Sequence, residues 1–356
     1  MAEWRECSLE SVCSRLSSGK GISAKLISES GVYPVYGGNG IRGYTDTSNF
    51  KGECAIVGRQ GAYCGNVRYF RGEAYMTEHA VVVCANEDNC TRYLAYLLAT
   101  MNLGRLSGQS AQPGLSVKTL GKQEIRMPDK KVQLKCAELL GSLDEKISHN
   151  EEVNKNLEQQ ADALYQAFFS PKSETKGKIV TLDEFCSIFT GKKNANASVN
   201  GGKYKFFTCA PDALQIDSYI YDGNAIIVSG NGAYTGRTRF YCGKFDLYQR
   251  TYACTLLDNV NPEFIFPLYW FVKLELSKKI MGGTRGSAIP YIVMNDLAKF
   301  EFIYNEQTFT EYMPIFKSLT EAIQANEFEN ENLAQIRDSL LPKLMSGEID
   351  VSDIDI

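Results

Sequence analysis

Two stretches of the sequence decide how the chain is organised: GECAIVGRQGAYCG at Gly52–Gly65 and GNAIIVSGNGAYTG at Gly223–Gly236. They align without a gap at a constant offset of 171 positions, and at the same offset Arg68 falls on Arg239. Self-similarity at a fixed spacing is the signature of an internal repeat. The sequence therefore predicts one globular unit that is written twice.

The duplication continues beyond these stretches into a long helix after each copy. The segment SAQP at Ser110–Pro113 corresponds to SAIP at Ser287–Pro290, now at an offset of 177. Two runs of residues then step by three and four without a break, which is the seam of a coiled coil. The first run is Leu140, Leu143, Ile147, Asn150, Asn154, Leu157, Ala161, Leu164 and Phe168, and the second is Phe316, Leu319, Ile323, Asn326, Asn330, Leu333, Arg337, Leu340 and Leu344.

The two seams each carry a pair of asparagines at matching positions. A buried asparagine in such a seam weakens packing but fixes register and partner number, which favours pairing between the two helices. Two alternatives stay open: each helix packs on its own domain, or the asparagines face water near a frayed centre. Pro171 ends the first helix.

The globular halves combine short β-prone runs with packed helices. Strands are expected at the following runs: Cys54–Val57, Val67–Phe70, Ile226–Val228 and Arg237–Tyr241. Thr91–Leu106 and Glu263–Ile280 are apolar enough, at helical length, to form buried helices. We therefore expect an α+β protein with two mixed α/β domains that alternate with two long helices.

Length and composition limit the class of protein to which the chain can belong. The chain has 356 residues, 44% of them hydrophobic and 22% charged, which suits two globular domains without a membrane span. It starts without the apolar core of a signal peptide, so its 11 cysteines, which form no C-x-x-C pair, are expected to be reduced.

The charges are unevenly distributed along the chain. Residues 1–132 and 171–310 carry positive excesses of 4 and 3 charges, whereas 133–170 and 311–356 carry negative excesses of 4 and 7. Only the basic blocks suit contact with phosphate.

Enzyme signatures are mostly absent from the sequence. It contains no P-loop, no G-x-S-x-G elbow and no H-E-x-x-H helix, and the glycine turns do not fit the dinucleotide fingerprint. With only His79 and His149 available, neither with a counterpart in the other copy, no histidine-rich metal site is expected, and both are interpreted as structural. An enzyme acting alone is therefore disfavoured, and no metal or cofactor is expected.

The repeated turns are the most informative local elements. Within a common G-A-Y-x-G frame, Arg59-Gln60 of one copy is replaced by Gly230-Asn231 in the other. Arginine pairs with guanine in the major groove, and glutamine or asparagine with adenine, so the change suits two readers of different sequences. Alternatively, the glycines serve a tight hairpin and the tyrosines pack in the core.

Further side chains complete the candidate DNA-contacting set, although any single arginine can equally be a solvated surface charge. The set is Arg42, Arg59, Gln60, Gly61, Tyr63, Arg68, Arg105 and Gln109 in the first copy and Gly230, Asn231, Gly232, Tyr234, Arg237, Arg239 and Arg285 in the second.

The ending LLPKLMSGEI at Leu340–Ile349 resembles the C-terminal region of type I restriction-modification specificity subunits. The layout is similar as well, and it implies a target-recognition domain at 1–131, a helix at 132–170, a second recognition domain at 171–310, a helix at 311–347 and an acidic tail at 348–356. The resemblance implies a non-catalytic, cytoplasmic DNA reader. Its partners would be double-stranded DNA, two adenine methyltransferase subunits, which bind the methyl donor, and restriction translocase subunits.

A pseudo-two-fold follows if the two helices pair antiparallel. The seam Leu140–Phe168 is 29 residues long, or roughly 43 Å at ~1.5 Å per residue, which is about one turn of DNA or slightly more. We expect a bipartite target whose half-sites are unrelated and whose spacer is set by helix length. The alternative is an interaction scaffold built on a helical hairpin without DNA specificity.

Overall fold

The computed structural model describes residues 3–107, 114–281 and 291–352. The chain divides into two compact units: unit 1 comprises Met1–His149 and Glu329–Ile356, and unit 2 comprises Asn150–Phe328. Among the helices of the described ranges, none is both long enough and apolar enough to cross a bilayer.

Unit 1 is built on a six-stranded sheet with the order β2-β7-β5-β6-β3-β4. All neighbours in it are antiparallel except β3 and β6. A separate antiparallel pair joins β1 to β8. The elements are β1 (Trp4–Ser8), β2 (Cys13–Ser18), β3 (Tyr33–Gly37), β4 (Gly40–Thr45), β5 (Phe50–Gly58), β6 (Val67–Met76), β7 (Ala80–Ala85), α1 (Thr91–Thr100), α2 (Val117–Gly121) and β8 (Glu124–Pro128).

Unit 2 repeats this topology strand for strand. Its six-stranded sheet has the order β10-β15-β13-β14-β11-β12, the parallel pair is β11 and β14, and a second small sheet joins β16 to β9. The duplication predicted from the sequence therefore extends to the order of the strands. The elements are β9 (Lys178–Thr181), β10 (Cys186–Thr190), β11 (Tyr204–Phe207), β12 (Leu214–Ile216), β13 (Tyr221–Ser229), β14 (Thr238–Leu247), β15 (Thr251–Leu256), α4 (Ile265–Met281), α5 (Met294–Ala298) and β16 (Glu301–Tyr304).

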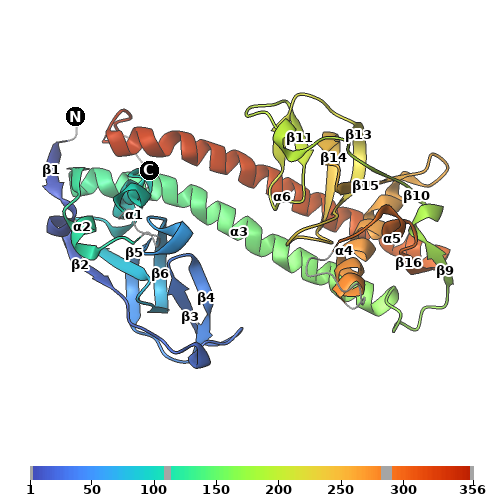
Figure 1. Ribbon diagram of the computed structural model, residues 1–356, viewed down its shortest axis with the longest axis horizontal. Coiled ribbons are helices and arrows are strands. Elements are labelled where there is room, and N and C mark those ends of the chain that lie inside the picture. Colours follow the sequence, from blue (N-terminus) through green and yellow to red (C-terminus); the bar gives the residue numbers. More distant parts are fainter. Residues whose placement is uncertain (1–2, 108–113, 282–290, 353–356) are drawn as a thin grey trace. The chain divides into compact units, whose positions relative to one another are not determined.

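Each central strand is buried on both faces, which explains its unbroken apolar run. Ala55 and Val57 of β5 join the cluster that contains α1, whereas Cys54 and Ile56 point into a second cluster on the other face. This alternation is the period of two that a β-strand imposes. Helix α1 packs across β5 and β6 (Figure 1).

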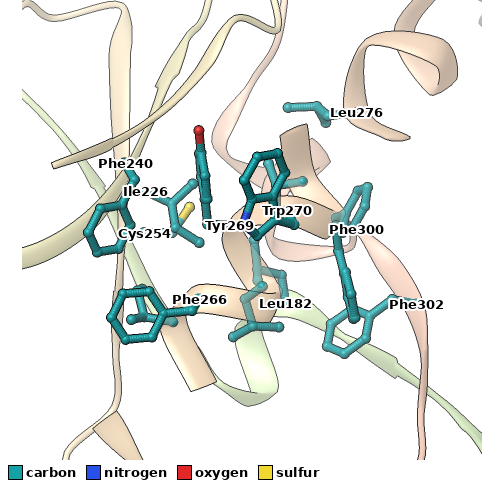
Figure 2. Packing of buried hydrophobic residues seen from close by; sticks show 14 of the residues in the cluster. Leu182, Ile226, Phe240, Cys254, Phe266, Tyr269, Trp270, Leu276, Phe300 and Phe302 are labelled. Atoms are coloured by element: carbon teal, nitrogen blue, oxygen red, sulfur yellow. The ribbon is translucent and has the colours of Figure 1, made fainter. Parts of the chain in front are cut away.

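The core of unit 2 is dominated by aromatic side chains on α4. Figure 2 shows Trp270 and Tyr269 of this helix among Ile226, Phe240 and Cys254 of the sheet. Trp270 is fully buried, and its indole nitrogen donates a 2.9 Å hydrogen bond to Thr320 Oγ1. The helix predicted at Thr91–Leu106 ends at Thr100 and is followed by a 3-10 turn at Leu103–Leu106. The helix predicted at Glu263–Ile280 begins at Ile265, after a 3-10 turn at Pro262–Phe264, and ends at Met281.

Two long helices contribute residues to both units: α3 (Lys130–Phe168) and α6 (Glu306–Ser346). Each starts before the predicted segments 132–170 and 311–347, because a side chain caps its first turn. Asp129 Oδ1 accepts the Val132 amide hydrogen at 3.0 Å, and Asn305 Oδ1 accepts that of Thr308 at 3.0 Å.

None of the seam residues predicted from the sequence is exposed. Seven of them are buried, and the others are half-buried; the buried ones are Leu140, Asn150, Ala161, Phe316, Leu319, Ile323 and Leu344. Asn326 Nδ2 donates a 2.7 Å hydrogen bond to Asn154 Oδ1 within unit 2. The alternative in which the asparagines face water is therefore wrong for these residues.

Segments of both helices lie together within each unit. In unit 1, Leu140 of α3 shares a buried cluster with Leu344 of α6, and Asp144 forms a 2.8 Å ion pair with Arg337. In unit 2, the seam residue Ala161 of α3 shares a cluster with Phe316, Leu319 and Ile323 of α6. Arg337, the one charged residue of the predicted seams, is thus paired with a carboxylate.

Candidate nucleic-acid interface

The glycine turns of the two units have the same backbone. Gly61 and Gly232 have φ of +75° and +82°, and Gly65 and Gly236 have φ of +87° and +83°. The amide of Gly65 donates to the Gly58 carbonyl at 2.8 Å, and that of Gly236 donates to Ser229 at 2.8 Å. The glycines therefore serve a left-handed backbone, as the hairpin interpretation predicts.

The surface of these turns is accessible. A Cβ added at Gly61 or Gly232 would have no heavy atom within 4 Å, so open space lies beside the backbone at both positions. Tyr63 and Tyr234 are 47% and 45% exposed, which excludes the interpretation of these side chains as core. The Arg237 guanidinium lies 5.7 Å from the centre of the Tyr234 ring.

The segment that follows the second repeated motif packs beside each turn. The Leu115 amide donates to the Arg59 carbonyl at 2.8 Å, and the Ile292 amide donates to the Gly230 carbonyl at 2.8 Å. Single β-bridges join Gln60 to Gly114 and Asn231 to Tyr291. The S-A-x-P motifs themselves and the candidates Gln109 and Arg285 lie outside the described residues.

A third loop, which precedes β7 or β15, meets the same turn. The Arg59 amide donates to the His79 carbonyl at 3.0 Å, and the Gly230 amide donates to the Arg250 carbonyl at 2.8 Å. His79 and Arg250 are 171 positions apart, so they are equivalent. His79 thus has a positional equivalent, which the constant offset of 171 also indicates, although that position holds an arginine and no histidine.

A fourth loop, between β3 and β4 or β11 and β12, completes the cluster. A Cβ at Gly38 would lie 3.2 Å from the His79 carbonyl oxygen. At the equivalent position of unit 2, Cys209 Sγ lies 3.3 Å from the Arg250 carbonyl oxygen. We call these four meeting loops the turn cluster of each unit: residues 37–40, 58–65, 77–80 and 114–115 in unit 1, and 208–211, 229–236, 248–251 and 291–292 in unit 2.

Two equivalent candidate arginines lie beside the fourth loop, and one of them holds it in place. Arg239 Nη2 donates to the carbonyls of Ala210 and Pro211 at 2.5 and 2.6 Å, and burial together with the nearby Arg237 lowers its pKa. Its equivalent Arg68 lies beside Gly40, where an added Cβ would be 3.3 Å from its Cζ atom. Arg239 thus positions a loop, whereas Arg68 is exposed as well as adjacent to one.

The remaining candidates differ in their surroundings. Arg42, Arg105 and Arg237 are exposed. The Arg42 side chain packs against Gly37, where an added Cβ would lie 2.6 Å from Arg42 Cδ. Arg59 is half-buried, and its Nη1 donates to Ser18 Oγ at 3.3 Å.

A second pair of equivalent residues ties β6 and β14 to the loop that follows β2 or β10. In unit 1, the Tyr75 hydroxyl donates to the Gly21 carbonyl at 3.0 Å. In unit 2, the equivalent residue is Asp246, which is 4% exposed. Its carboxylate forms an ion pair with Lys193 Nζ at 2.8 Å and accepts a hydrogen bond from Ser218 Oγ at 2.8 Å. A hydrogen bond from tyrosine in unit 1 and an ion pair of aspartate in unit 2 thus connect equivalent strands to equivalent loops.

Chemistry suited to catalysis is not evident at these clusters. In the three described segments of the chain, no group of three or more His, Cys, Asp or Glu side chains is arranged to hold a metal ion. What the clusters offer is amide, guanidinium, imidazole and phenol groups, exposed or half-buried, on a hydrogen-bonded backbone. Such groups bind phosphates, base edges and base faces.

Comparison with known proteins agrees with this chemistry. A sequence family described as "Type I restriction modification DNA specificity domain" matches residues 1–159 and 175–337. The EcoprrI specificity subunit of Escherichia coli is 39% identical over 145 residues, and the EcoDI specificity subunit of the same species is 36% identical over 177 residues. These matches cover 40% and 48% of this chain but only 36% and 38% of the relatives, so the chain spans less than two-fifths of their length.

Two more distant matches cover most of the chain. The MjaIX specificity subunit of Methanocaldococcus jannaschii is 23% identical over 304 residues, which is 74% of this chain and 70% of that protein. The crystal structure of a type I restriction-modification S subunit from M. genitalium superposes with a TM-score of 0.66 at 18% identity and covers 96% of both chains. The latter shows that the two proteins share a fold.

Proposed function

Because this chain belongs to the type I restriction modification DNA specificity domain family, we propose that it is the non-catalytic DNA-recognition subunit of a type I restriction-modification complex. The observation that carries the proposal is the pair of turn clusters. Their backbones are equivalent hydrogen bond for hydrogen bond, while the side chains on them differ. A constant frame with variable polar groups is what two readers of different half-sites require.

Exposed and half-buried polar groups of the turn clusters supply the contacts. Gln60 and Asn231 carry amides that can pair with adenine, and Arg59 carries a guanidinium that can pair with guanine. Tyr63 and Tyr234 are exposed beside open backbone, where a base or sugar can pack. We propose a bipartite, asymmetric target whose two half-sites are read by residues 1–131 and 171–310.

The two long helices are proposed to pair as an antiparallel coiled coil around a pseudo-two-fold axis. The contacts within the units support this arrangement, because Leu140 shares a cluster with Leu344 whereas Ala161 shares one with Phe316. Rising numbers along α3 thus correspond to falling numbers along α6. The helices would then set the spacer of the target.

The spacer is tested by deleting one heptad from both helices. The deletion removes about 10 Å of helix, or roughly three base pairs of separation. We expect the preferred spacer to shorten by about that amount, or binding to be abolished because the readers turn out of phase with the groove. An unchanged spacer would contradict the proposed geometry.

Docking of partner subunits is proposed on the acidic helices, away from phosphate. Glu151 and Glu152 of α3 and Glu327 of α6 are exposed, and Phe328 beside Glu327 is 67% exposed. An exposed aromatic side chain next to carboxylates suits a protein partner rather than DNA. The partners proposed are two adenine methyltransferase subunits, which hold the methyl donor, and restriction translocase subunits, all in the cytoplasm.

The experiment that tests the function is sequencing of native genomic DNA, with detection of modified adenines, from strains with and without this gene. A bipartite motif that loses its methyl marks on deletion supports the reader role. Unchanged marks, in a strain that demonstrably expresses the methyltransferase, would refute it. The helical hairpin scaffold without DNA specificity would then be the better account.

A further inference from the structure

His79 is placed beside the candidate reader Gln60 by both backbone and side chain. The His79 carbonyl accepts the Arg59 amide hydrogen at 3.0 Å, which fixes the loop that carries the ring. His79 Nδ1 then lies 2.9 Å from Gln60 Oε1. The other ring nitrogen, Nε2, lies 3.2 Å from Glu78 Oε1, and the His79 side chain keeps 39% of its surface exposed.

These contacts constrain both the ring and the amide. The Glu78 carboxylate only accepts hydrogen bonds, so Nε2 of the ring donates to it, and Nδ1 is the ring atom that bonds the Gln60 amide. Glu78 therefore orients the ring, and the ring in turn holds one end of the Gln60 amide. The other end of the amide is left to face an external partner.

This arrangement restricts what Gln60 can read. A free glutamine side chain rotates its amide and can present either end to a base edge. With one end held by His79, the amide presents only its other end to the major groove. An NH2 end matches N7 of a purine, O6 of guanine and O4 of thymine, whereas a carbonyl end matches the amino groups of adenine and cytosine.

We propose that His79 is a specificity-determining positioning residue, which selects the base pair read by Gln60 by fixing the orientation of its amide. The proposal rests on the proposed DNA-reading function. In unit 2 the equivalent residue is the exposed Arg250, whose carbonyl accepts the amide hydrogen of Gly230, the residue before Asn231. The same position thus carries a different group in each reader, which makes Arg250 the matched control.

The test is selection from a pool of randomised DNA duplexes by the full chain and its variants, with base preference measured at every position. His79→Ala is expected to lower the preference at one base pair of one half-site by about tenfold, the scale of a well-placed base contact. The other half-site should keep its preferences, and Arg250→Ala should show the converse pattern. If the wild-type chain selects no motif, the proposed function itself fails.

A double-mutant cycle separates positioning from a general effect on the fold. If His79 acts through Gln60, the variant Gln60→Ala/His79→Ala shows no further loss beyond Gln60→Ala alone. His79→Gln, whose amide can donate to the Gln60 carbonyl, should recover part of the preference and also serves if the alanine variant fails to fold. The proposal is overturned by an unchanged preference profile, by additive losses, or by a uniform loss of affinity for all duplexes.

Discussion

Replacing Thr320 with valine tests how α6 is joined to the core of unit 2. The Thr320 side chain is 2% exposed, and its hydroxyl accepts a 2.9 Å hydrogen bond from the fully buried indole of Trp270. The same hydroxyl donates to the Phe316 carbonyl at 2.7 Å. Valine keeps the shape and the β-branch but offers no acceptor.

The expected cost follows from the orphaned indole donor. A buried donor left without a partner costs about 1–3 kcal/mol, because it loses water in the folded state and gains nothing in exchange. With an m-value of about 2 kcal/mol per molar urea, the midpoint of unfolding should fall by roughly 0.5–1.5 M. Urea denaturation followed by the fluorescence of Trp270 measures this, in a Trp4→Phe background, since the chain contains only these two tryptophans.

Thr310 provides the matched control on the same helix. Its hydroxyl likewise donates to the carbonyl four residues earlier, Glu306, at 2.8 Å, but the side chain is exposed. Thr310→Val should change the free energy of unfolding by less than about 0.5 kcal/mol. If Thr320→Val is as stable as Thr310→Val, the hydrogen bond to Trp270 does not anchor α6 and our reasoning is refuted.

Three further predictions concern the seam, a buried ion pair and the thiols. Replacing Asn154 and Asn326 together with leucine should raise the melting temperature of the chain but make the register between the two long helices less specific. Light scattering after gel filtration should then detect oligomers, whereas a single monodisperse species would argue against a role of these asparagines in register. Lys193→Met should destabilise unit 2 by about 2 kcal/mol, because it removes the cation from the buried Asp246 and leaves only neutral donors, the Ser218 hydroxyl and the Leu247 amide; a urea midpoint equal to that of the wild type would contradict this. Burial raises the pKa of Cys186 to about 12, so iodoacetamide at pH 8 should modify the exposed Cys242 and spare Cys186 until urea is added; mass spectrometry showing equal labelling in the native protein would exclude the expected burial.

The sequence determined the features that depend on local periodicity and on repetition. A seam that steps by three and four residues needs only the geometry of one helix, so the positions from Leu140 to Leu344 were predicted correctly as non-exposed. The apolar runs at Cys54–Val57 and Ile226–Val228 were likewise sufficient to predict central strands. The constant offset of 171 established the duplication before any contact was known.

The order of the strands and the composition of the turn clusters were decided by the tertiary structure. Strand β7 lies between β2 and β5, and the loops that meet at Arg59 come from segments as far apart as Gly38 and Leu115. The contact between His79 and Gln60 and the role of Arg239 in holding a carbonyl pair have no local pattern. These residues are brought together by backbone hydrogen bonds between distant segments and by burial in a common core. Neither produces a periodic pattern in the sequence from which the contact could be predicted.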